Sequence, residues 1–151
     1  YTRISAEPVT SHSMVLFTHK DNRKMKRLKS IDTVSDLKAF TSVNYIGNGW
    51  AEKKLQGIEV TWVPTMDKAL LLLANNRYDF FAGGATNVRH SLKRLGYDQQ
   101  VQETSIVLDS VAHKLCVGKQ SPFVSILPAF DEAVRKLRKN GALQKIIARY
   151  E

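Results

Sequence analysis

Apolar and polar positions follow two different periods along the first two thirds of the chain. Short segments at residues 13–18, 42–46, 58–63 and 78–82 are apolar or alternate with polar residues, which is typical of strands. The stretches after them carry helix signals at residues 34–40, 50–56, 66–75 and 87–95. Four strands that alternate with four helices predict a parallel sheet with helices on both of its faces.

Local signals support two of these helices. Thr33 is the expected N-cap of the helix at 34–40, and Asp36 three residues later completes a capping-box-like pair. The helix at 66–75 is apolar nearly all round from 69 to 73. A helix without a polar face is expected to be well buried, so this one should lie against the sheet.

The last third of the chain departs from this alternation. Two strand-like segments, at 102–107 and 111–117, precede two helices that begin at Pro122 and Ala142, the second reaching Tyr150. An apolar stripe predicts a buried face on the first of these helices: Phe123, Leu127, Phe130, Val134 and Leu137. Both helices need a sheet to cover. We therefore expect the strands at 13–18 and 111–117 to cross between two lobes.

The chain of 151 residues is basic, with a formal net charge of +9, and 43% of its residues are hydrophobic, as in an ordinary folded domain. Lysines and arginines gather at 20–29 and again at 135–149. Neither group is interleaved with aromatic residues as in a nucleic-acid-binding surface. We therefore expect solvated surfaces and no nucleic-acid partner. No apolar run is long enough to span a bilayer.

The sequence lacks the common motifs of catalytic sites. The four histidines are scattered, with no His-Glu-x-x-His or cysteine partner, so no metal site is expected. There is no Gly-x-Ser-x-Gly elbow, no Walker loop and no convincing carboxylate pair, so we expect no catalytic residue and no cofactor. The single cysteine, Cys116, has no partner for an internal disulfide, and its strand-like surroundings predict a buried thiol.

Several short segments occur in an order and spacing that are informative together. They are residues 30–38 (SIDTVSDLK), 45–50 (YIGNGW), 66–70 (MDKAL), 73–80 (LANNRYDF), 117–122 (VGKQSP) and 137–146 (LRKNGALQKI), followed by Arg149 and Tyr150. This series resembles the family 3 extracellular solute-binding proteins, which have the type 2 periplasmic-binding fold. The resemblance covers nearly the whole chain.

The resemblance implies an α/β fold of two lobes, in which the chain builds half of lobe 1, crosses to build lobe 2, and returns. Residues 1–23 are then the crossing strand and linker from lobe 1, and residues 24–107 are a complete, doubly wound lobe 2. Residues 108–151 are the return strand and the C-terminal helices of a partial lobe 1. Its first half, with the family's carboxylate-binding arginine, is expected to lie outside this sequence.

The turn after the second strand is the first candidate for a ligand site. It consists of Gly47, Asn48, Gly49, Trp50 and Ala51. Backbone N–H groups at a helix N-terminus, with glycines that permit close approach, suit a carboxylate or another anion. Ligands in open α/β sheets bind at the carboxyl ends of strands, where this turn falls. The conformational needs of a turn explain the same residues, but the resemblance favours ligand binding.

A second candidate follows the fourth strand and comprises Gly83, Gly84 and Thr86. Amino-acid-binding members of the family often carry an aspartate here, where this chain has Gly84 or Ala85. The resemblance therefore does not imply a standard α-amino acid as the ligand. Thr86 is expected to cap the following helix while it faces the ligand. Thr65 lies at the same edge of the sheet, although helix capping alone explains it.

The resemblance implies an extracytoplasmic, periplasmic solute-binding component of the ABC-transporter type. It would bind a small polar or anionic solute in a cleft between two lobes and deliver it to a membrane permease. The alternatives are a ligand-sensing domain of a signalling protein, a dehydratase-like enzyme on the same fold, and the effector domain of a transcription regulator. Because lobe 1 is incomplete, we expect its helices to bury their apolar faces on the missing half-lobe or on a second copy, as a homodimer.

Overall fold

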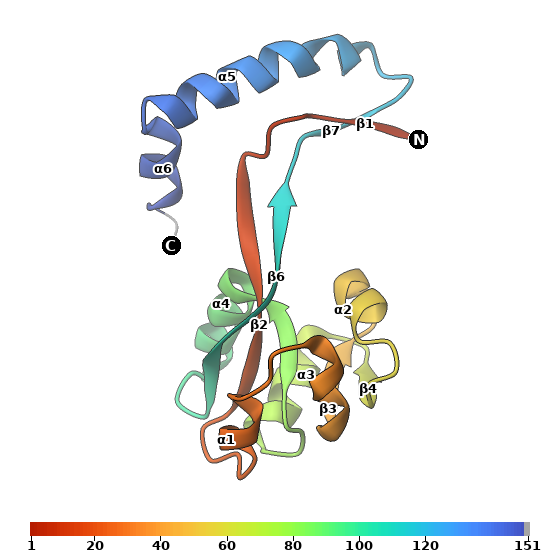
Figure 1. The fold of residues 1–151 in the computed structure, drawn as a ribbon, viewed down its shortest axis with the longest axis vertical. Helices are drawn as coiled ribbons and strands as arrows, with labels where there is room; N and C mark the ends of the chain where they lie inside the picture. The colour runs from red at the N-terminus through yellow and green to blue at the C-terminus, as the bar shows by residue number, and fades with distance from the viewer. Residues whose placement is uncertain (150–151) are drawn as a thin grey trace. The chain divides into compact units, whose positions relative to one another are not determined.

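The computed structural model describes residues 1–149 and divides the chain into two compact units (Figure 1). The α/β unit consists of Ser13–Asp109, and the terminal unit combines Tyr1–His12 with the chain from Ser110 onward. Two strands belong to both units: β2 (Thr10–His19) and β6 (Val101–His113). Within residues 1–149, no helix has both the length and the apolar character that a membrane span requires.

The α/β unit is built on five strands. The strands β3 (Ser42–Tyr45) and β4 (Val60–Val63) pair in parallel, and β5 (Phe81–Gly84) pairs antiparallel with β2, which has β6 on its other side. A parallel bridge between Ser42 and Phe80 joins the two groups of strands, and the Oγ of Ser42 donates to the carbonyl oxygen of Phe80 at 3.2 Å. The spatial order is therefore β4-β3-β5-β2-β6.

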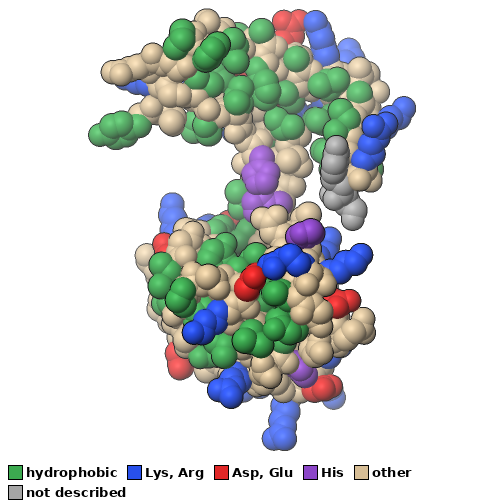
Figure 2. Space-filling model, turned by 180° about the vertical axis from the view of Figure 1, so that it is seen from behind, with side chains coloured by type: hydrophobic (Ala, Val, Ile, Leu, Met, Phe, Trp, Pro, Cys, Tyr) green, Lys and Arg blue, Asp and Glu red, His purple; other side chains and the backbone are tan. Residues whose placement is uncertain are grey.

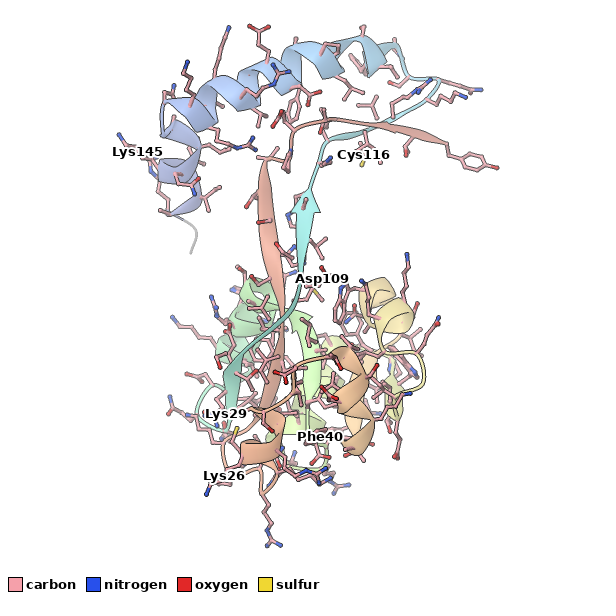
Figure 3. All side chains as sticks on the ribbon, viewed as in Figure 1. Lys26, Lys29, Phe40, Asp109, Cys116 and Lys145 are labelled. Atoms are coloured by element: carbon pink, nitrogen blue, oxygen red, sulfur yellow. The ribbon has the colours of Figure 1, made fainter. Side chains whose placement is uncertain are left out.

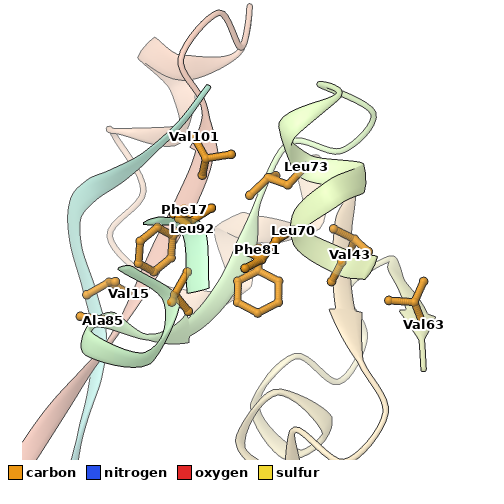
Figure 4. Packing of buried hydrophobic residues seen from close by; sticks show 12 residues of the cluster. Val15, Phe17, Val43, Val63, Leu70, Leu73, Phe81, Ala85, Leu92 and Val101 are labelled. Atoms are coloured by element: carbon orange, nitrogen blue, oxygen red, sulfur yellow. The ribbon is translucent and has the colours of Figure 1, made fainter. Parts of the chain in front are cut away.

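Helices cover both faces of these strands. They are α1 (Met25–Leu28), the 3₁₀ helix η1 (Val34–Ala39), α2 (Gly49–Lys54), α3 (Met66–Ala74) and α4 (Ala85–Leu95). Side chains alternate along β2 so that Val15 and Phe17 enter one hydrophobic cluster, whereas Leu16 enters the other. The first cluster packs α3 and α4 on the strands (Figure 4), and the second packs α1, η1 and α2. The predicted doubly wound α/β architecture is confirmed.

Several predicted boundaries differ from the structure. The helix predicted at 34–40 is a 3₁₀ helix, although its capping pair forms: the N–H of Thr33 donates to Oδ2 of Asp36 at 2.8 Å. The strand predicted at 78–82 occurs at Phe81–Gly84, and α4 follows directly at Ala85. The two strands predicted at 102–107 and 111–117 are mostly one strand, β6, because no turn interrupts it. The chain therefore passes between the units within β6, at 109–110.

The terminal unit has little of its own core. Its strands β1 (Thr2–Ile4) and β7 (Cys116–Gly118) form a two-stranded antiparallel sheet, followed by η2 (Pro122–Ile126), α5 (Leu127–Lys139) and α6 (Ala142–Ile147). Among its described residues, the buried hydrophobic side chains are Val134 and Leu143, and neither belongs to a hydrophobic cluster. Figure 2 shows hydrophobic side chains at the surface of this unit. The last predicted helical residue, Tyr150, lies outside the described residues.

The apolar face predicted on the first C-terminal helix is only partly covered within the described residues, and the prediction of a buried Cys116 is wrong. Of the apolar stripe predicted on the first C-terminal helix, Val134 is buried, whereas Phe123 is 63% exposed and Leu137 is 36% exposed. Cys116 is exposed as well, because it lies in a short two-stranded sheet rather than in a covered strand. The sequence periodicity identified the apolar face of the helix correctly, but within the described residues no layer covers that face.

Hydrogen bonds to one carboxylate hold the N-terminal segment onto α5. Asp131 is buried and accepts from the backbone N–H of Glu7 at 2.9 Å and from that of Ala6 at 3.1 Å. These two bonds, with that from Glu7 the larger cause, hold the pKa of Asp131 below its usual value. Arg138 adds an ion pair with Glu7 at 2.7 Å.

Candidate functional site

The predicted site residues lie at one edge of the α/β unit. The strands β3, β4 and β5 run parallel to one another, so their carboxyl ends meet at the same edge. The turn at 46–48 follows β3, Thr65 follows β4, and α4 follows β5. Since β3 lies between the other two strands, its turn is flanked by Thr65 on one side and by Gly84 on the other. This edge is where open α/β sheets bind ligands.

A buried pair of asparagines holds this edge together. Nδ2 of Asn44 donates to the carbonyl oxygen of Ala82 at 2.9 Å, so a side chain links β3 to β5 in place of a further backbone ladder bond. Oδ1 of Asn44 accepts from Nδ2 of Asn48 at 2.8 Å and from the N–H of Tyr45 at 2.9 Å. Oδ1 of Asn48 in turn accepts from the N–H of Ala51 and caps α2. Asn48 therefore positions the turn with a side chain that is already fully engaged.

The turn at Gly47–Ala51 satisfies much of its own hydrogen-bonding capacity. Gly47 has a φ of 94°, which only glycine adopts without strain, and its N–H donates to Oε1 of Glu52 at 2.9 Å. The side chain of Ala51 is fully buried in the core. Gly49 is exposed and has open space where a Cβ would stand. A carboxylate of this chain thus already occupies the N–H of Gly47.

Trp50 is tied to the strand that leaves the α/β unit. Its Nε1 donates to Oδ2 of Asp109 at 2.9 Å, and Nζ of Lys54 lies 3.4 Å from the same oxygen. Figure 3 labels Asp109 on β6. The indole is half-buried, so its position is set by this bond as well as by packing.

The segment at 83–86 differs from the first turn, because no side chain caps α4 and no acidic residue lies in its first turn. The prediction that Thr86 caps this helix is wrong. Gly84 is the N-cap and has an extended backbone, and Thr86 is exposed in the first turn. The positive end of α4 therefore has no carboxylate of its own first turn beside it. Gly83 has a separate reason to be glycine, since an added Cβ would come within 2.6 Å of Cε1 of Phe81 and 3.0 Å of Cγ2 of Val88.

Thr65 has a defined structural task at this edge. Its Oγ1 accepts from the N–H of Lys68 at 3.2 Å, which makes it the N-cap of α3 as the sequence predicted. The residue is exposed.

Asp79 has a structural role away from the candidate edge. Its Oδ2 accepts from Nζ of Lys24 at 2.7 Å and from the N–H of Thr41 at 2.8 Å. Its carbonyl oxygen accepts from Oγ1 of Thr18 and from Nδ2 of Asn22, both at 2.8 Å. These contacts join β2, α1 and the start of β3 at the end of the sheet opposite the candidate edge.

Sequence reasoning missed two residues that shape the edge. Asn44 lies in a strand between Val43 and Tyr45, and a polar residue between these two is the only signal in the sequence. The structure buries its side chain fully, so the amide must be hydrogen-bonded. Asp109 lies 59 residues from Trp50, so no local pattern connects the two. Both act by holding other residues in place.

Comparison with solved structures agrees with this architecture. A mutant of the arginine-binding protein ArgBP from T. maritima is 23% identical, with a TM-score of 0.70 over 99% of this chain and 61% of that chain. The glutamate-bound ligand-binding core of GluR0 from Nostoc punctiforme is 16% identical, with a TM-score of 0.66 over 99% of this chain and 65% of that one. A histidine kinase sensor domain is 17% identical, with a TM-score of 0.68 over 97% of this chain and 62% of that one. No protein-family profile and no curated protein sequence matches the chain.

These similarities define the class of fold. The chain has the fold of the periplasmic binding proteins, so the resemblance predicted from the sequence is confirmed at the level of fold. It spans less than two thirds of the length of these solved structures. These solved structures are of binding, receptor and sensor proteins.

Proposed function

We propose that this chain is the larger part of an extracytoplasmic, periplasmic solute-binding component that serves a membrane permease of the ABC type. The observation that carries the proposal is the fold, which matches named solute-binding proteins over 99% of the chain, including an L-cystine receptor and an L-arginine-bound ABC transporter component. In this reading the chain binds its solute without transforming it.

The bound solute is small and polar or anionic. The supporting observation is the first turn of α4, which has Gly84 as its N-cap and no carboxylate to meet an ammonium group. Thr86 offers a hydroxyl there, and the uncapped helix end favours negative charge. Thr65 and the turn at Gly47–Ala51 contribute from the neighbouring strands. Since the N–H of Gly47 is engaged by Glu52, the segment at 83–86 is the stronger half of the proposed site.

Two carboxylates near the turn at 47–51 support a binding role over a dehydratase-like one. Glu52 accepts from the N–H of Gly47, and Asp109 accepts from Trp50 and lies beside Lys54. Both have structural partners, whereas an acid/base pair needs groups that face a substrate.

A sensor domain is the second candidate, because the sensor domain of a histidine kinase has the same fold with a TM-score of 0.68. Both candidates bind a solute in the same way and differ in the partner that reads the bound state. Stimulation of solute uptake by a permease in proteoliposomes separates them, since a sensor domain would give no uptake.

The terminal unit requires further polypeptide to bury its apolar side chains. Phe123, Ile126, Leu137 and Ile146 are each at least 36% exposed, and burial of such side chains contributes roughly 1.5–3 kcal/mol each. We infer that they pack on the half-lobe missing from this chain, or on a second copy of the chain in a homodimer. Sedimentation of the full chain distinguishes the two, because the homodimer dissociates on dilution.

A thermal-shift screen tests the proposed function. The full-length protein is melted with panels of amino acids, organic acids and phosphorylated solutes, because a ligand that binds only the folded state must raise the melting temperature. At a ligand concentration of 100 Kd the stabilisation is about 2.7 kcal/mol, which corresponds to a rise of several degrees. No shift with any panel would contradict the proposal.

A substitution at Gly84 tests the class of ligand. Gly84→Asp places a carboxylate at the N-cap of α4, a position where aspartate is favoured, so the fold should persist. Binding of an anionic solute should weaken by about tenfold or more, because two like charges then share the site. Gly118→Asp is the matched control, since Gly118 lies in the terminal unit with open space around it. Unchanged affinity in Gly84→Asp would move the site away from α4.

A further inference from the structure

Two histidines from distant parts of the sequence meet in the terminal unit. His12 lies in β2 and His113 lies in β6, and Nδ1 of His12 is 2.7 Å from Nε2 of His113. The two ring centroids are 4.5 Å apart, with an angle of 44° between the ring planes. The positions of the two rings are fixed by two strands, and both side chains remain accessible to solvent.

The two nitrogens that face each other share one hydrogen bond. At 2.7 Å one ring donates a hydrogen bond and the other accepts it, so at least one of the two imidazoles is neutral. Partial burial, and then the charge of His113, lower the pKa of His12. Neutral imidazole is the form that binds metal ions.

The separation of the facing nitrogens is closer to one ligand geometry than to another. With metal–nitrogen bonds of about 2.0–2.1 Å, two ligands at a right angle are separated by about 2.9 Å, and two tetrahedral ligands by about 3.4 Å. The observed 2.7 Å is close to the right-angle value, and a small rotation of either ring would open it. Right-angle ligand pairs belong to tetragonal or octahedral ions, of which Cu²⁺ binds nitrogen ligands most tightly and Ni²⁺ next among those that suit this geometry.

We propose that His12 and His113 chelate one divalent transition-metal ion, with Cu²⁺ preferred over Ni²⁺ and Zn²⁺. Within residues 1–149 no group of three or more His, Cys, Asp or Glu side chains gathers as a metal site, so water completes the coordination. The site is bidentate and open. The ring that now donates carries its proton on its other nitrogen in the complex, so that both facing nitrogens bind the ion as neutral imidazoles. It would fasten β2 to β6 at the start of the terminal unit.

The sequence did not reveal this pair, and a metal site was not expected. The two histidines are separated by 101 residues and stand in no ligand motif. They meet because β2 and β6 are neighbours in the sheet and both continue into the terminal unit. Strand pairing brings the two histidines together, whereas their spacing in the sequence does not indicate it.

Metal titration of the full chain tests the proposal. Cu²⁺, Ni²⁺ and Zn²⁺ are added separately at pH 7.5 and followed by calorimetry, and the Cu²⁺ complex is examined by electron paramagnetic resonance. One Cu²⁺ should bind with coupling to two ring nitrogens, and more tightly than Zn²⁺. Binding should weaken as the pH is lowered, because protons compete with the ion for the ring nitrogens.

Substitutions locate the ion. His12→Gln and His113→Gln should each raise the Kd for Cu²⁺ by about tenfold or more and leave coupling to one nitrogen, because each removes one of two ligands. His90→Gln is the matched control, since His90 is exposed on α4, and it should change neither. If both variants bind Cu²⁺ like the parent chain, or if Zn²⁺ binds more tightly than Cu²⁺, the proposal is wrong. Far-ultraviolet circular dichroism of each variant verifies that it is folded.

Discussion

The link between β3 and β5 makes Asn44 the residue whose replacement should be most informative. Its side chain takes part in three hydrogen bonds, with Ala82, Tyr45 and Asn48, at 2.8–2.9 Å, and it is fully buried. Asn44→Ala removes all three. Each such bond contributes about 0.5–1.5 kcal/mol net, and the stranded partners add a desolvation cost, so we expect a loss of about 2–4 kcal/mol.

The two tryptophans give a direct assay for this loss. Trp50 and Trp62 both lie in the α/β unit, so their fluorescence during urea denaturation follows that unit alone. The matched control is Gln56→Ala, which removes an exposed amide and should change the free energy of unfolding by no more than about 0.5 kcal/mol. If Asn44→Ala loses less than about 1 kcal/mol, the backbone alone holds β3 to β5 and the argument from side-chain bonds fails.

Two further predictions concern packing and pH. Gly83→Ala should destabilise the α/β unit by about 1–3 kcal/mol in the same denaturation assay, because the new methyl group overlaps Phe81 and Val88; a neutral substitution would show that these side chains yield easily. The pKa of Asp131 is lower in the folded chain than in the unfolded chain, where it is about 3.9. Asp131 therefore stabilises the fold above that pH, and its contribution is lost as the pH falls through the lower folded pKa. Hydrogen exchange of the Glu7 amide should accelerate in that range, and Asp131→Asn should give fast exchange already at neutral pH; equal protection in both would refute the role of the carboxylate.

Much of the fold was accessible from the sequence because local patterns carry it. The alternation of Val15, Leu16 and Phe17, with the helix signals between strands, was enough to predict a sheet covered on both faces. The position of the fourth strand was less accessible. Gly83 and Gly84 are predicted to follow the strand, but both belong to it, and the close approach of Phe81 and Val88 explains why position 83 is glycine.

The candidate site was less predictable, because its properties depend on contacts between distant residues. The sequence identified the turns after β3 and β5 but ranked the first above the second. That ranking changes once Glu52 is seen to accept from the N–H of Gly47, while α4 has no carboxylate in its first turn. The exposure of Phe123 was also inaccessible, since a helical stripe predicts an apolar face without saying what covers it.

The alternation along β2 limits how this protein can change in length. Val15 and Phe17 face α3 and α4, whereas Leu16 faces the opposite cluster, so one inserted or deleted residue would exchange the two sets. Every later side chain of the strand would then point into the wrong layer. Insertions and deletions among homologues should therefore fall outside β2, in exposed loops where a change in length leaves both layers intact.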